Sequence, residues 1–192
     1  MQSPDKSHSK NGHVCPWWLA YTFDNPIRNL FQKPQKMLAP YVKQGMRVMD
    51  VGCGMGFFSI GMAKLVGDKG KVFSVDLQPE MLEVTERRAK RAGVAERIFS
   101  HRCGPDTLDI DEKVDFILTF WMVHEVKDQR GFFSQLQSNL NGGGKILTAE
   151  PKMHVTTAEF QKTLEIAQSA DLQLWAQPPI RFSHAALFTV NE

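Results

Sequence analysis

The chain has 192 residues and a formal net charge of +2. This length fits a single folded domain without a separate substrate domain, and the nearly balanced charge does not favour nucleic acid or an anionic membrane as a partner. Cys15, Cys53 and Cys103 form no C-x-x-C pair and are too scattered for a disulfide framework, so we expect a cytoplasmic protein.

The first 44 residues divide into two segments of different composition. Residues 1–13 are polar and have almost nothing to bury, which predicts a disordered tail. Residues 14–44 combine large apolar side chains with prolines, which predicts short helical turns that cover another part of the molecule. The apolar run 17–23 is too short for a membrane span and lacks the basic lead of a signal peptide. We interpret residues 14–44 as a lid and residues 45–192 as the main domain.

Strand and helix patterns alternate from Gly45 onward, which is typical of a parallel sheet with helices on both faces. The last two predicted strands are separated by only about eight residues, too few for a helical crossover, so they should form an antiparallel hairpin. The predicted fold is therefore α/β, with a seven-stranded, mostly parallel sheet. Strands are predicted at residues 47–51, 71–76, 98–102, 115–120, 145–149, 172–176 and 185–190, and helices at 57–66, 79–92, 129–140 and 157–170.

A glycine-rich turn follows the first predicted strand, where residues 48–58 have the sequence VMDVGCGMGFF. Glycines let the backbone bend sharply and let a ligand approach the peptide groups. The dinucleotide fingerprint G-x-G-x-x-G would need a glycine in place of Phe57, and Asp50 would repel a diphosphate. A cationic or zwitterionic nucleoside without phosphate, such as S-adenosylmethionine, suits this pattern better.

The pattern D-x-G-x-G-x-G at residues 50–56 closely resembles motif I of the class I S-adenosylmethionine-dependent methyltransferases. The resemblance extends from about residue 46 to the C-terminus and implies their Rossmann-like fold. It also implies that Asp50 accepts a hydrogen bond from the methionine ammonium; the alternative role for Asp50 is a strand-end cap. The backbone that would enclose the methionine and ribose belongs to Gly52, Cys53, Gly54 and Gly56.

A second acid, Asp76, ends the next predicted strand. At this place the class holds a carboxylate against the ribose hydroxyls, a task that suits a planar group with several acceptor positions. The resemblance then implies that Leu77 and Met81 enclose the adenine, although Met81 could equally be a helix residue that faces the core.

The segment after the third predicted strand departs from the pattern of the class. The class often has an acid there that binds the adenine amino group, whereas residues 101–106 have the sequence HRCGPD. We therefore expect the backbone near Cys103 and Gly104 to bind the adenine, with Asp106 as the less favoured partner.

The fourth predicted strand leads into residues 119–126, TFWMVHEV, which resemble the segment of the class beneath the transferred methyl group. By this resemblance Phe120 borders the methionine end, while Trp121 and His124 extend toward the acceptor. Methyl transfer from a sulfonium needs alignment and a dry site, and it needs a base only when the acceptor arrives protonated. His124 is the candidate base; a structural histidine is the alternative. Glu125 should point elsewhere, so no dyad is predicted.

Further aromatic and histidine side chains are weaker candidates for contacts with the ligands. The class commonly covers its cofactor with residues before the first strand, so Trp17, Trp18 and Tyr21 could contact cofactor or acceptor. His154 and His184 could also enter the pocket. Ordinary packing is the competing explanation for all five residues.

The cysteines and a basic run each allow a second function, a metalloid site and RNA binding, and each also has a simpler explanation. The three thiols could converge on a soft metalloid, but burial as small apolar side chains explains them better, and we expect no metal. The basic run RRAKR at residues 87–91 could bind RNA, but its spacing fits an ordinary solvated helix face.

The sequence thus predicts S-adenosylmethionine-dependent transfer of a methyl group to a small-molecule acceptor. The alternatives are a methyltransferase that acts on RNA or protein and a non-catalytic module that binds S-adenosylmethionine. The accepting atom and the oligomeric state stay open, with a homodimer among the alternatives.

Overall fold

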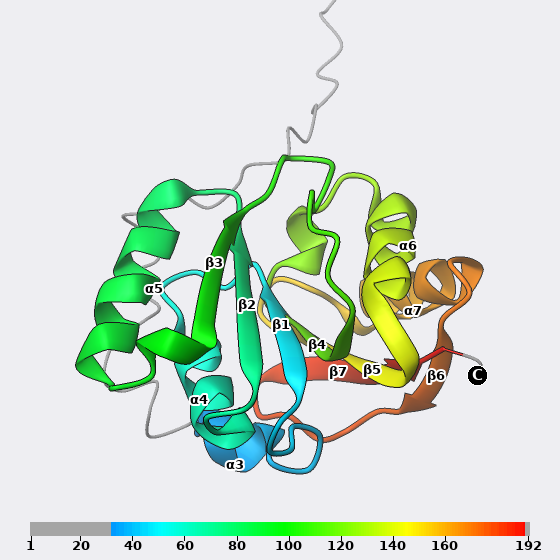
Figure 1. The fold of residues 1–192 in the computed structure, drawn as a ribbon. Helices are drawn as coiled ribbons and strands as arrows, with labels where there is room; N and C mark the ends of the chain where they lie inside the picture. The colour runs from blue at the N-terminus through cyan, green and yellow to red at the C-terminus, as the bar shows by residue number, and fades with distance from the viewer. Residues whose placement is uncertain (1–31, 191–192) are drawn as a thin grey trace, which may run out of the picture.

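The computed structural model describes residues 32–190, which form a seven-stranded sheet with helices on both faces (Figure 1). The strands are β1 (Arg47–Val51), β2 (Lys71–Asp76), β3 (Ile98–Arg102), β4 (Val114–Phe120), β5 (Leu140–Pro151), β6 (Gln173–Ala176) and β7 (Ser183–Thr189). The helices are α3 (Pro34–Leu38), α4 (Phe57–Val66), α5 (Pro79–Arg91), α6 (Gln129–Asn139) and α7 (Thr157–Ser169), and the 3₁₀ turns are η1 (Ala95–Arg97) and η2 (Val123–Glu125).

The strands follow the order β3-β2-β1-β4-β5-β7-β6. β1 to β5 run parallel to one another, and β7 runs antiparallel between β5 and β6. This confirms the predicted sheet and its antiparallel C-terminal hairpin. Because the chain winds from β1 outward to β3 and then returns to β4, the switch point lies between β1 and β4. Ligands of open α/β sheets bind above the carboxyl ends of the strands at this point.

The sheet is buried on both faces, which explains its continuous apolar strands. Consecutive strand residues point to opposite faces, so Val48 belongs to the hydrophobic cluster under α4, whereas Met49 belongs to the cluster under α6 and α7. Figure 1 shows these two groups of helices on opposite sides of the sheet. Because helices pack on both faces, the carboxyl ends of the strands are held in fixed positions at one edge of the sheet.

β5 is longer than predicted at both ends. Its first residues pair with β4 through a bulge, because Val114 pairs with Leu140 whereas Phe116 pairs with Lys145, so the glycine-rich stretch lies within the strand. At its other end β5 extends to Pro151, which pairs with Ser183 of β7. The prediction ended this strand at residue 149 and therefore placed Glu150 outside the sheet.

The described part of the predicted lid lies on the core. Leu38 in α3 is fully buried, and a Cβ at Gly61 of α4 would lie 2.5 Å from the Pro34 side chain. The predicted tail and the remainder of the lid, including Cys15, Trp17, Trp18 and Tyr21, lie outside the described residues. Within residues 32–190 no helix has the length and apolar character needed to cross a bilayer.

Candidate functional site

The glycine turn, residues 52–56, connects the carboxyl end of β1 to α4. Gly52, Gly54 and Gly56 all have positive φ angles, of 69°, 53° and 77°, a conformation that L side chains rarely adopt. A Cβ at Gly52 would lie 2.8 Å from Met122, and one at Gly56 would lie 2.6 Å from Thr85, whereas a Cβ at Gly54 would meet no atom of residues 32–190 within 4 Å. The outer two glycines are thus required by packing, whereas the described part of the chain leaves the space above Gly54 open.

Asp76 bonds to the middle of this turn from the end of β2. Its side-chain Oδ2 accepts a hydrogen bond from the Gly54 N–H at 2.8 Å, and its Oδ1 accepts one from the Gln78 N–H at 3.0 Å. Burial raises the pKa of this carboxyl, although the backbone hydrogen bonds act in the opposite direction. A carboxylate has about four acceptor positions, so two N–H donors leave capacity for further donors such as hydroxyls.

Asp50 lies one strand away, within β1 and 2% exposed. Its Oδ2 accepts a hydrogen bond from the Ser59 hydroxyl of α4 at 2.5 Å. This contact joins the end of β1 to the first turns of α4 and matches the alternative role, a strand-end cap. Binding of a ligand ammonium by Asp50 stays a prediction.

Helix α5 supports the glycine turn through two side chains that the sequence analysis missed. The Thr85 hydroxyl donates to the Gly54 carbonyl at 3.0 Å, and Arg88 donates to the Met55 carbonyl at 3.2 Å. These residues are three positions apart and therefore share one helix face. Arg88 belongs to the basic run 87–91. One guanidinium of this run therefore bonds to the glycine turn. In the sequence, the only signal for these contacts is the three-residue spacing of Thr85 and Arg88, which places both on one face of α5.

The expected adenine contacts lie around the same edge. Leu77 is half-buried, and Met81, in the first turn of α5, is 4% exposed. The Cys103 N–H donates to the Asp76 carbonyl at 3.1 Å, and the Gly104 N–H donates to the Thr107 carbonyl at 2.9 Å. Leu77 and Cys103 therefore lie beside Asp76, and the backbone N–H groups of Cys103 and Gly104 are already bonded within the protein.

The thiols of the two described cysteines have raised pKa values. Burial is the main cause that raises the pKa of Cys53 well above its usual value and the pKa of Cys103 to about 11, and the nearby Asp76 acts in the same direction. Neither sulfur is a thiolate near neutral pH. Residues 32–190 also contain no group of three or more His, Cys, Asp or Glu side chains placed to hold a metal ion.

Phe120 and Trp121 mark the carboxyl end of β4. Phe120 is 6% exposed and its ring centroid lies 4.3 Å from that of Phe58. Trp121 has a φ of 61°, an unusual conformation for a bulky residue that costs about 1–3 kcal/mol. Its Nε1 donates to the Ser183 hydroxyl at 2.8 Å, and its N–H donates to the Ala149 carbonyl at 2.7 Å. These bonds to β7 and β5 hold the strained turn.

Glu150 is a further candidate site residue that the sequence analysis did not predict. It lies near the end of β5, is 1% exposed and accepts hydrogen bonds from the backbone N–H groups of Met122, Val123 and His124 at 3.0–3.2 Å. Its Oε2 also lies 2.5 Å from Nδ1 of His124. The carboxylate can only accept, so Nδ1 carries the proton and Nε2 is the basic nitrogen. An acid directly after an apolar strand was the available signal.

The Glu150 contact changes the chemistry of His124. Hydrogen bonding to Glu150 is the main cause that raises the pKa of His124, while partial burial acts in the opposite direction. The sequence analysis predicted no dyad because it considered only the adjacent Glu125; the acidic partner comes instead from β5. The His124 side chain stays 28% exposed and is therefore reachable by a ligand.

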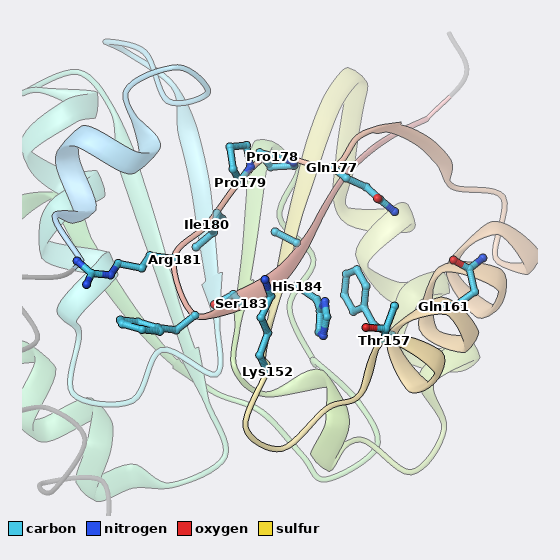
Figure 2. A pocket seen from close by; sticks show the side chains of 13 residues that line it. Lys152, Thr157, Gln161, Gln177, Pro178, Pro179, Ile180, Arg181, Ser183 and His184 are labelled. Atoms are coloured by element: carbon cyan, nitrogen blue, oxygen red, sulfur yellow. The ribbon is translucent and has the colours of Figure 1, made fainter.

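The two other candidate histidines, His154 and His184, have different surroundings. The ring of His154 is stacked on that of His124, with centroids 6.2 Å apart and planes 8° apart. His184 lies against Phe160 instead, with centroids 5.4 Å apart. His154 thus adjoins the Glu150–His124 pair, whereas His184 lines the pocket shown in Figure 2.

The sheet order and the glycine turn together define the fold of the class I S-adenosylmethionine-dependent methyltransferases. Residues 42–178 match the family model described as a methyltransferase domain. The chain belongs to this family, whose cofactor is S-adenosylmethionine.

Comparison with individual proteins agrees with this assignment. The chain is 24% identical over 115 residues to demethylmenaquinone methyltransferase of Bacillus velezensis, covering 58% of this chain and 49% of that protein. It is 30% identical over 104 residues to protein-L-isoaspartate O-methyltransferase of Thermotoga maritima, covering 54% and 31%. The chain thus spans about half or less of the length of these relatives. The crystal structure of an Aquifex aeolicus SAM-dependent methyltransferase shares the fold, with a TM-score of 0.82, 22% identity and coverage of 91% of this chain and 98% of that one.

Proposed function

We propose that this chain transfers a methyl group from S-adenosylmethionine to a small-molecule acceptor. The observation that carries the proposal is the glycine turn bonded to Asp76 at the switch point of the sheet, where no atom of residues 32–190 would lie within 4 Å of a Cβ at Gly54. The Glu150–His124 pair lies at the carboxyl ends of the neighbouring strands β4 and β5 and supplies a base.

The residues at the ends of β1 and β2 fit the cofactor. The cofactor supplies an electrophilic methyl group on a sulfonium. The two oxygens of Asp76 would accept hydrogen bonds from the ribose hydroxyls, and the backbone of the glycine turn would lie against the methionine and ribose. Asp50 would attract the ammonium. The remaining expected contacts are Leu77, Met81, Cys103 and Gly104 at the adenine and Phe120 at the methionine end.

His124 has the arrangement of a general base. Glu150 fixes the ring and its tautomer and would stabilise the imidazolium that forms when Nε2 takes a proton from the acceptor, as the acid of a Ser-His-Asp triad does. The reaction otherwise needs in-line alignment and exclusion of water. The base therefore matters most for acceptors that arrive with a proton on the attacking atom.

A small acceptor is supported by the demethylmenaquinone relative, which is named for a small-molecule substrate. The basic run on α5 supports an RNA acceptor only weakly. One of its side chains, Arg88, is bonded to the glycine turn and is not directed at an RNA ligand. A protein acceptor is the stronger competitor, because the Thermotoga relative is named for a protein substrate.

Labelled methyl groups distinguish these possibilities. The purified chain would be incubated with methyl-labelled S-adenosylmethionine and a cell extract, which is then separated into metabolites, RNA and protein. The proposal predicts label in the metabolite fraction, at a level that falls in His124→Ala. Label confined to RNA or protein would contradict the small acceptor, and cofactor binding without any transfer would favour the non-catalytic module.

A further inference from the structure

His154 lies on the short turn, residues 152–156, that joins the end of β5 to α7. The backbone of this turn is fixed at both ends. The N–H groups of His154 and Val155 donate to the Pro151 carbonyl at 3.0 Å and 2.9 Å. The Val155 side chain is buried in the cluster under α6 and α7, and Thr156 then caps α7. The position of His154 is therefore set by the core, although its side chain is exposed.

The turn brings the His154 ring onto the ring of the proposed base. The centroids of His154 and His124 are 6.2 Å apart and their planes differ by 8°, a distance typical of aromatic pairs. Glu150 bonds to Nδ1, on the edge of the same His124 ring. The carboxylate thus holds the edge of the ring, and His154 covers one of its faces.

This arrangement matters when His124 becomes charged. A cation is attracted to the electron-rich face of an aromatic ring. Two charged imidazoliums in a stack would instead repel each other. Hydrogen bonding to Glu150 raises the pKa of His124, so the positive charge of the stacked pair belongs on His124. His154 is then the neutral ring that faces it.

Other titratable groups around the pair act in known directions. Glu125, on the same 3₁₀ turn as His124, also raises the pKa of His124, whereas partial burial lowers it. His184 is paired with Glu150 in the sheet, but its ring is stacked on Phe160 of α7. The groups that act on the charge of His124 are therefore Glu150, Glu125 and the His154 ring.

We propose that His154 is a positioning residue for methyl transfer, whose neutral ring fixes the plane of His124 and stabilises the imidazolium that forms. The inference rests on the proposed function and adds a residue to the same site. In the reaction the acceptor atom bonds to the methyl carbon, and the electron pair of the carbon–sulfur bond stays on sulfur. The acceptor proton passes to Nε2 of His124. His154 acts through its ring face, so its own nitrogens are not required.

Matched variants test the proposal. His154→Phe keeps a flat ring without nitrogens, and His154→Ala removes the ring. Met153→Ala is the control on the same turn, where the Met153 side chain is 88% exposed. The pKa of His124 would be measured by NMR titration of the full chain saturated with S-adenosylhomocysteine, with the signal assigned through His124→Gln. The rate of labelled methyl transfer to the metabolite fraction of a cell extract would be measured at a pH above the His124 transition.

We expect His154→Ala to lower the pKa of His124 by about 0.5 and the transfer rate by about threefold, because the imidazolium loses the facing ring. His154→Phe and Met153→Ala should keep both values close to those of wild type.

Three results would overturn the proposal. A pKa of His124 that is unchanged or higher in His154→Ala would show that the stacked ring does not favour the imidazolium. Equal losses in His154→Phe and His154→Ala would show that the nitrogens of His154 are needed. A lowered pKa with an unchanged transfer rate would show that the contact has no role in the reaction.

The experiment also separates this inference from the proposed function. If wild type does not bind S-adenosylhomocysteine or transfers no methyl group, the proposed function itself fails. If wild type transfers methyl groups and His154→Ala does so at the same rate, only the role of His154 is refuted.

Discussion

The side-chain oxygen Oε2 of Glu150 lies 2.5 Å from Nδ1 of His124, and it joins the end of β5 to the turn that follows β4. The same carboxylate caps three backbone N–H groups of that turn. One buried acid therefore both shapes the turn and orients the ring. In the proposed function Nε2, the nitrogen on the other side of the ring, accepts the proton of the methyl acceptor.

Removing the negative charge of Glu150 should impair turnover more than cofactor binding. For a hydroxyl acceptor, Glu150→Gln should lower kcat by on the order of 10²-fold, because the ring loses its orientation and its counter-ion. Steady-state kinetics and titration with S-adenosylhomocysteine measure the two effects.

Controls for this variant separate chemistry from stability. Glu165→Gln removes an exposed acid on α7 and should leave kcat unchanged. Glu150→Gln should also lower the free energy of unfolding by about 1–3 kcal/mol, since an amide cannot accept all four bonds. If kcat stays at the wild-type value while the variant is folded, Glu150 has no role in proton transfer.

The pH dependence of kcat/KM should report His124. Only the neutral ring can accept a proton, and Glu150 raises the pKa of His124 above its usual 6.5. We expect kcat/KM to fall as the pH decreases through a midpoint above 6.5, and this midpoint should move to lower pH in Glu150→Gln. Identical profiles in the two proteins would show that another group controls the midpoint.

The raised pKa of His124 also makes the free energy of unfolding depend on pH. This stability falls as the pH rises, whereas kcat/KM falls as the pH decreases. Because the folded pKa lies above the unfolded one, the contribution of the pair is fully present below pH 6.5 and is lost as the pH rises through the folded pKa. Denaturant titrations across this range should show Glu150→Gln losing this dependence.

The space that the described residues leave open above Gly54 can be filled with a single methyl group. Gly54→Ala should cost about 1–2 kcal/mol of stability, because of its positive φ, and should lower the affinity for S-adenosylhomocysteine at least about tenfold. Gly93→Ala is the matched control, since Gly93 also has a positive φ, of 68°, and open space around its Cβ, but lies beyond the end of α5. Equal affinities in the two variants would argue against a ligand over Gly54.

The hydrogen bond between Trp121 and Ser183 should stabilise the strained turn at Trp121. Trp121→Phe and Ser183→Ala should each lower the free energy of unfolding by about 1 kcal/mol, and the double variant should cost less than their sum. A double-mutant cycle measured by denaturant titration checks this. Additive effects would mean that the hydrogen bond contributes nothing to the stability of the fold.

The glycine turn and Asp76 could be predicted because their signals are local. Both stand at the carboxyl ends of apolar strands, and parallel strands bring these ends to one edge of the sheet whatever the details of packing. The alternating pattern also predicted the seven strands and the final hairpin. These features depend on the order of short segments and not on distant contacts.

The Glu150–His124 pair required information that is not local. It depends on the register of β4 against β5 and on β5 continuing past Ala149, which its pairing with β7 decides. The contacts of Thr85 and Arg88 depend likewise on how α5 lies over the turn. The positive φ of Trp121 was unpredictable, since local preference opposes it and the bonds to Ala149 and Ser183 impose it.

Calorimetric titration with S-adenosylhomocysteine, comparing wild type with Asp76→Ala, tests the proposed cofactor site most directly. Asp76 bonds to Gly54 in the open turn, so its removal deletes both a support of the turn and the acceptor proposed for the ribose hydroxyls. We predict saturable binding at one site in wild type and at least about tenfold weaker binding in the variant. Absence of binding to wild type, or equal affinity in Asp76→Ala, would contradict the proposed site.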